Sequence, residues 1–160
     1  MDLYTLYAAI RDGIAQDGEL NAWAVSEFGR SIKVFSGIPS DDFPNMDEDA
    51  PFVALGDPQD HRSQNRDEIF YALAGWVGLT NGHQKTDIVN SNVIEPQGVK
   101  QIIDAMRLVR LAIAAALPEG VTIEDFSTAA DTLGAHDEVN GYFETSFRQG
   151  KLTIGTNALT

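Results

Sequence analysis

The stretch RDEIFYALAGWVGLT, residues 66–80, is the strongest strand signal in the chain. Alternate positions form one apolar face, made of Ile69, Tyr71, Leu73, Val77 and Leu79. The positions between them form a second apolar face, made of Phe70, Ala72, Ala74 and Trp76. Because both faces are apolar, we expect a strand that is covered on two sides. Gly75 and Gly78 predict a bulge or a close approach of the backbone to a neighbouring group.

Helical patterns lie on both sides of this strand. Apolar residues between positions 3 and 15 recur at spacings of three and four, which predicts an amphipathic helix. A second, shorter helix is expected over residues 19–28, where Gly29 closes it. A long helix is expected over residues 99–117. Its end, LVRLAIAAAL, is apolar almost all round, so we expect it at the centre of the domain.

Shorter strand signals complete the pattern. They cover residues 32–35, 52–55, 121–126 and 141–153, with polar connectors at 56–65 and 81–92 and a helix-compatible turn through 135. Consecutive strands with short links favour antiparallel pairing, and the helices are then placed on one face. The sequence therefore predicts an α+β fold, a mainly antiparallel sheet with helices packed on one face, in one domain over residues 1–160.

Charge and composition exclude several functions. The chain has 24 acidic residues against 11 lysines and arginines, a net charge of -13. It therefore lacks the basic surface that general or sequence-specific nucleic-acid binding requires, and that docking on an anionic membrane requires. It has no cysteine, its three histidines stand apart, and no phosphate-binding glycine motif or GxSxG motif occurs. We therefore expect no bound metal, no cofactor and no catalytic residue.

The stretch SGIPSDDFPNMDEDAP, residues 36–51, differs from the rest of the chain. It has three prolines and no helix or strand period, so we expect a mobile loop. Its acidic residues are the one dense constellation in the sequence, namely Asp41, Asp42, Asp47, Glu48 and Asp49. They have three interpretations: a solvated surface loop, a negative surface with a function, or the carboxylates of a small metal-dependent hydrolase or ligand-binding domain.

Phe70 and Trp76, on the second face of the central strand, also have two interpretations. They can belong to the core beneath the long helix. Alternatively, a sheet face left uncovered by the helices becomes a subunit interface, where tryptophan and other aromatic residues contribute much of the binding energy. The pattern of the sequence favours neither.

The order of these elements is similar to that of a known family. The chain opens with DLYTLYAAIRDGIAQDGELNAW, residues 2–23, a first amphipathic helix followed by an Asp-x-x-Leu start to a second. A short strand, a proline-containing loop and the segment DAPFVALGD, residues 49–57, come next. The long strand, the long helix and a terminal strand at 142–148 follow in order. In this layout, the chain resembles bacteriophage tail terminator, or tail completion, proteins over nearly its whole length.

The resemblance implies a structural role and no enzymatic activity. It implies a homo-hexameric ring in the virion, assembled in the host cytoplasm, that caps the tail tube and joins it to the head-side neck. Its partners would be the tail tube protein on one side and a head-tail connector or stopper on the other. Another neck component, a stopper or adaptor, is the alternative within this class. In such a ring Phe70 and Trp76 would contribute to the oligomer interface, and the acidic loop would face a channel through which DNA passes.

Overall fold

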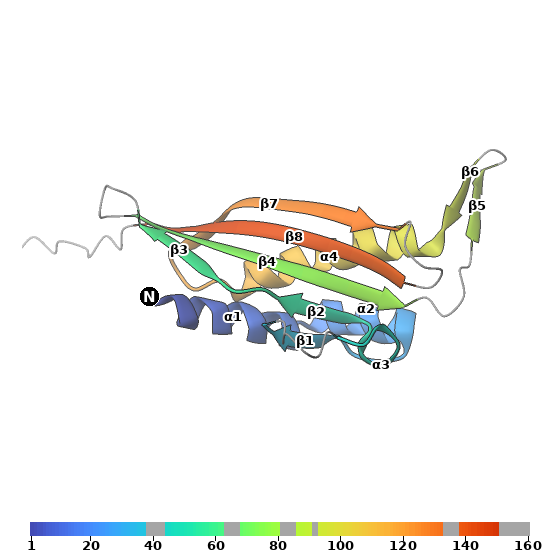
Figure 1. Cartoon of the computed structure of the whole chain (residues 1–160), viewed down its shortest axis with the longest axis horizontal. Helices are drawn as coiled ribbons and strands as arrows, with labels where there is room; N and C mark the ends of the chain where they lie inside the picture. The colour runs from blue at the N-terminus through green and yellow to red at the C-terminus, as the bar shows by residue number, and fades with distance from the viewer. Residues whose placement is uncertain (38–43, 63–67, 81–85, 91–92, 133–137, 151–160) are drawn as a thin grey trace, which may run out of the picture.

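The computed structural model of the chain describes residues 1–37, 44–62, 68–80, 86–90, 93–132 and 138–150. Within these residues the helices α1 (Leu3–Gln16), α2 (Gly18–Phe28) and α4 (Gln97–Ala116) pack on one face of a six-stranded sheet (Figure 1). This arrangement confirms the predicted α+β fold with helices packed on one face of the sheet.

The sheet has the strand order β1-β2-β4-β8-β7, and β3 pairs with β4. Its strands are β1 (Lys33–Ser36), β2 (Phe52–Leu55), β3 (Gln59–Arg62), β4 (Ile69–Thr80), β7 (Val121–Asp131) and β8 (Glu138–Gln149). β1 and β2 are parallel, and the other pairs are antiparallel. β4 pairs with β8 over its full length, and β2 and β3 share its other edge. The strand with the strongest sequence signal therefore lies in the middle of the sheet.

Short polar side chains determine where the first two helices begin. Asp2 and Asp17 each accept a hydrogen bond at 2.8 Å from a backbone N–H three residues later, of Thr5 and Leu20 respectively. Asp17 also ends α1, which leaves no linker between the two helices. Gly29 ends α2 in the left-handed conformation, with φ of 74°.

The main core lies between the helices and the sheet. The helices contribute aliphatic side chains, among them Leu6, Ile10, Ile14, Leu20, Ile102, Val109 and Ile113. The sheet contributes alternate residues of two strands, Tyr71, Leu73, Val77, Leu79, Phe143 and Phe147. A Cβ atom at Gly75 would collide with the ring of Phe143, so the close approach predicted at this glycine is confirmed. The inward face predicted for β4 is confirmed too, with Ile69 only half-buried.

Several segments predicted as connectors or turns are strands. β3 lies in the first polar connector, and β5 (Thr86–Asn90) lies in the second and pairs with β6 (Val93–Pro96) in a separate two-stranded sheet. β7 continues to Asp131, through the region for which the sequence favours a helix-compatible turn, and β8 begins at Glu138. Sequence alternation misses the end of β7 because residues 127–131 are exposed and therefore carry no apolar period.

The end of α4 does not lie at the centre of the domain. Ala112 and Ile113 are buried, whereas the neighbouring Leu111 is 48% exposed and Ala114 is exposed. The expected all-round burial is wrong because only one stripe of the helix faces the sheet. An apolar surface is therefore left on the outside of the molecule.

Candidate functional site

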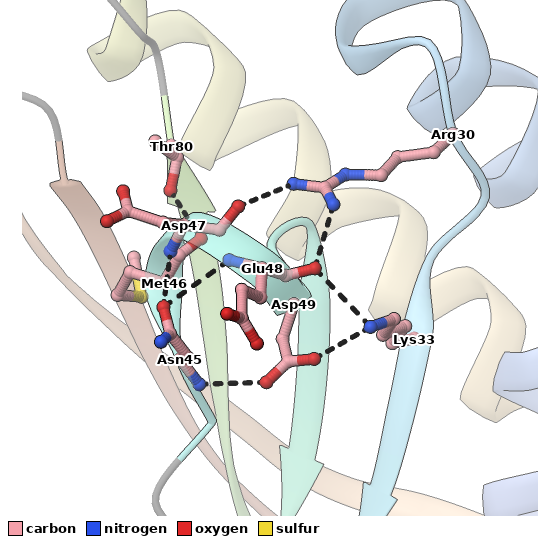
Figure 2. Close-up of polar contacts among 8 residues, drawn as sticks. All are labelled: Arg30, Lys33, Asn45, Met46, Asp47, Glu48, Asp49 and Thr80. Atoms are coloured by element: carbon pink, nitrogen blue, oxygen red, sulfur yellow. Dashed lines mark hydrogen bonds and ion pairs between the residues drawn. The ribbon is translucent and has the colours of Figure 1, made fainter.

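The acidic segment contains a helical turn, α3 (Met46–Asp49), as Figure 2 shows. Oδ1 of Asn45 accepts the N–H groups of Asp47 at 2.9 Å and Glu48 at 3.4 Å. Oδ2 of Asp49 accepts the N–H of Asn45 at 2.8 Å, so the two side chains cap the turn reciprocally. The prediction of a loop without regular structure is wrong here, because these local bonds stabilise a helix too short to show a sequence period.

Neighbouring residues hold the carbonyl groups of α3. Arg30 donates to the carbonyl oxygens of Glu48 at 2.8 Å and Asp47 at 3.2 Å. The hydroxyl of Thr80, at the end of β4, donates to the carbonyl of Met46 at 2.8 Å. A cation at the carbonyl end of a helix stabilises it, so this part of the acidic segment is fixed against the sheet.

The acidic side chains of this segment are not equivalent. Nζ of Lys33 lies 2.7 Å from Oδ1 of Asp49, and this bond, together with the N–H of Asn45, lowers the pKa of that carboxyl group. Asp47 and Glu48 are exposed, and among the described residues their carboxylates form no ion pair. Asp41 and Asp42 lie outside the described residues.

Trp76 belongs to a second, smaller cluster on the face of the sheet opposite the long helices. Its ring centroid lies 4.9 Å from that of Phe52, edge to face, and 6.5 Å from that of Tyr142, stacked. Its indole N–H donates to Oδ1 of Asn140 at 2.8 Å. The other members are Phe35, Met46, Ala50 and Ala54. The side chain of Trp76 is thus half-buried against its own chain.

Phe70 lies on the same face but in a different place. It is half-buried and occupies the register positions opposite His61 on β3 and Arg148 on β8. Five residues of strand lie between Phe70 and Trp76, which places the two about 20 Å apart. The structure therefore places the two aromatic residues on one face without bringing them together.

A shallow depression of about 350 Å³ lies on this open face between the two aromatic positions. Three carboxylates line it, from Asp57, Asp125 and Glu144, and none of the described residues that line it is basic. The pairing places Glu144 between Ala74 and Ser127 on the adjacent strands. Because these two neighbours are small, the floor of the depression is low on both sides of Glu144. We call this depression the acidic trough.

The outer surface of α4 carries positive charge, opposite to that of the acidic trough. Ile103 is 60% exposed, Leu111 is 48% exposed, and Arg107 and Arg110 lie exposed between them. A groove of about 260 Å³ separates this surface from β7, and the guanidinium of Arg110 lies 5.8 Å from the ring centroid of Phe126. Neither arginine forms an ion pair among the described residues. We call these four α4 residues the outer stripe.

No protein-family model matches the chain, and no curated protein matches its sequence. Among the described residues, no three histidine or acidic side chains converge as metal ligands would. In that same part of the chain, no helix has the length and apolar composition needed to cross a membrane.

Sequence reasoning missed both the acidic trough and the outer stripe. The carboxylates of the trough are far apart in the sequence, and only the pairing of β4, β8 and β7 brings them together. The outer stripe was detectable in principle, because positions 103, 107, 110 and 111 share one side of a helix. Its two apolar members resemble core residues by type, so only the structure shows that they are exposed.

Proposed function

We propose that the chain is a structural subunit of a phage neck, of the tail-terminator type, which closes into a ring on the end of the tail tube. The observation that carries this proposal is the order of elements. Two helices joined at Asp17, a short strand, the segment around Pro51, a buried strand, a long strand, a long helix and terminal strands occur in this order, with β3 before the long strand and β5 and β6 after it. This order is similar to that of the family.

The uncovered face of the sheet also supports a role in assembly. Among the described residues, the long helices cover one face, and α3 with its aromatic cluster covers only one end of the other. The rest of that face carries the acidic trough and the half-buried Phe70. A subunit of a ring needs two different surfaces that complement each other, because cyclic contacts are heterologous.

The acidity of the chain fits a ring around DNA. Part of the net charge of -13 would face the channel, where it would repel phosphate and keep DNA from binding during passage. Among the described residues of the acidic segment, Asp47 and Glu48 are exposed enough to do so.

Native mass spectrometry of the protein over a range of concentrations, with negative-stain imaging alone and with tail tubes of the same phage, tests the proposal. We expect a closed ring, six-fold by resemblance, at the ends of the tubes. A protein that stays monomeric and ignores tube ends would contradict it. A ring that binds head-side components but not tubes would indicate a stopper or adaptor, and a melting temperature raised by Ca²⁺ or Mg²⁺ would favour the metal-dependent alternative.

A further inference from the structure

We propose that the outer stripe of α4 on one copy of this chain docks in the acidic trough on the next copy. This inference rests on the proposed function, since it names the contact that would build the ring. The occupant of the trough is a second copy, because the chain itself carries a surface that complements it in charge, in length and in the order of its side chains.

The complementarity begins with charge. The trough presents Asp57, Asp125 and Glu144, and in the part of the chain that the structure describes no lining residue is basic. The outer stripe presents Arg107 and Arg110 with no carboxylate partner in the described part of the chain. In a chain with 24 acidic residues and 11 lysines and arginines, two neighbouring arginines without such a partner are a notable excess of positive charge. Matched potentials of this kind steer association and select the partner.

The two surfaces also agree in the order of their side chains. Along the stripe, apolar Ile103 and Leu111 flank the arginines. Along the open face, the aromatic side chains of Phe70 and Trp76 flank the carboxylates, and Tyr142, 48% exposed, lies against Trp76. Apolar ends would therefore meet aromatic ends, and arginines would meet carboxylates.

Size permits this contact. The stripe from Ile103 to Leu111 spans about 12 Å of helix. The strand from Phe70 to Trp76 spans about 20 Å, so the stripe fits between the aromatic positions. The floor between them is lowered by Ala72 and Ala74, which leaves room for long side chains from a neighbour.

The geometry of the domain makes this contact heterologous. The outer stripe lies on the helical side of the sheet, and the trough lies on the opposite side. Each copy therefore offers one surface to the copy before it and the other to the copy after it, which generates a ring when the rotation closes. In this arrangement Phe70 and Trp76 border the interface, and Asp47 and Glu48 remain free for the channel.

Cysteine cross-linking tests the contact directly, because the chain has no cysteine of its own. Variants Arg107→Cys and Glu144→Cys are mixed and oxidised. We expect a disulfide-linked dimer in the mixture that neither variant forms alone. The matched control is a mixture of Glu144→Cys with Glu119→Cys, which lies exposed beyond α4 and outside the outer stripe. Equal cross-linking in both mixtures would overturn the inference.

Charge reversal gives an independent measurement. Arg107→Glu with Arg110→Glu should weaken self-association, measured by sedimentation, by more than about tenfold. Adding Asp57→Lys and Glu144→Lys should restore it, whereas Arg11→Glu, a charge reversal at a partly exposed position of α1, should change it little. Circular dichroism establishes that each variant is folded.

The possible results distinguish a failure of the proposed contact from a failure of the proposed ring. Closed rings with no effect of these variants would overturn the inference and leave the proposed function standing. A cross-linked, charge-dependent contact in a dimer or an open filament would support the inference and contradict the proposed function. A protein that is monomeric at every concentration, with and without tail tubes, would overturn both.

Discussion

Phe143 and Glu144 are consecutive residues of β8, yet their side chains lie on opposite faces of the sheet. Phe143 is 1% exposed, lies over Gly75 and stacks on Phe126 with ring centroids 5.4 Å apart. Glu144 is exposed in the acidic trough. The helix-covered face is filled by large apolar side chains, whereas the open face combines aromatic residues at its ends with small and acidic residues between them.

The covered face stabilises the fold, whereas the open face is the one proposed to bind a neighbouring copy. Burial on the covered face stabilises the fold by about 1.5–3 kcal/mol for each large side chain. Carboxylates gathered on the open face repel one another, so we do not expect them to stabilise the isolated subunit. The proposed contact with a second copy would account for this arrangement, and substitutions on the two faces should then give effects of different size and kind.

The largest effect is expected on the covered face. Phe143→Ala should lower the free energy of unfolding by about 3–5 kcal/mol, because it removes a buried ring and leaves a cavity beside Gly75. Urea unfolding followed by circular dichroism measures the change. Tyr142→Ala, the preceding residue on the open face, should cost no more than about 1 kcal/mol. Comparable losses for the two variants would contradict the division between faces.

A smaller effect is expected at the end of the open face that α3 covers. Asn45→Ala should lower the free energy of unfolding by about 1 kcal/mol, because the N–H groups of Asp47 and Glu48 lose their acceptor. Asn45→Asp is the matched variant, which retains an acceptor and should stay close to the wild type. Equal losses in both would show that the cap does not hold the turn.

The ion pair at Asp49 should make this end of the sheet sensitive to pH. Since folding lowers the pKa of Asp49 below its ordinary value of 3.8, its contribution is present above that value and is lost as pH falls through the folded pKa. Because the pair is at the surface, we expect a modest effect. The stability difference between wild type and Asp49→Asn should shrink between neutral pH and pH values below 3.8, and a constant difference would contradict this.

The smallest effect on stability is expected in the acidic trough. Asp57→Asn combined with Glu144→Gln should leave the free energy of unfolding within about 0.5 kcal/mol of the wild type. Thermal unfolding measures this, with Asp12→Asn as a surface control. A loss above about 1 kcal/mol would mean that these carboxylates stabilise the subunit, and the comparison of the two faces would then fail.

The sequence predicted the covered face well because burial imposes a period. The inward residues of β4, the amphipathic α1 and the end of α2 at Gly29 all follow from local patterns in the sequence. Each pattern involves residues that are close in the sequence, and the corresponding element of the structure confirms each one.

The open face could not be predicted in the same way. β3 and the end of β7 are exposed strands without apolar alternation, and α3 depends on side-chain bonds from Asn45 and Asp49. The acidic trough depends on register, since Glu144 reaches its neighbours on β4 and β7 only through long-range pairing. Alternation along β4 predicts that Phe70 and Trp76 share one face, but it does not show that about 20 Å of strand separates them.

The position of β8 determines when, during synthesis, the sheet of a subunit can be completed. β8 is the last strand of the described chain, yet it is inserted between β4 and β7. During synthesis, the edges of β4 and β7 that pair with β8 therefore stay unpaired until residues 138–149 have left the ribosome. The acidic trough is also completed only then, because Glu144 is carried by this strand. An unfinished chain thus lacks one of its two proposed docking surfaces, so on this proposal it cannot yet accept a neighbouring copy.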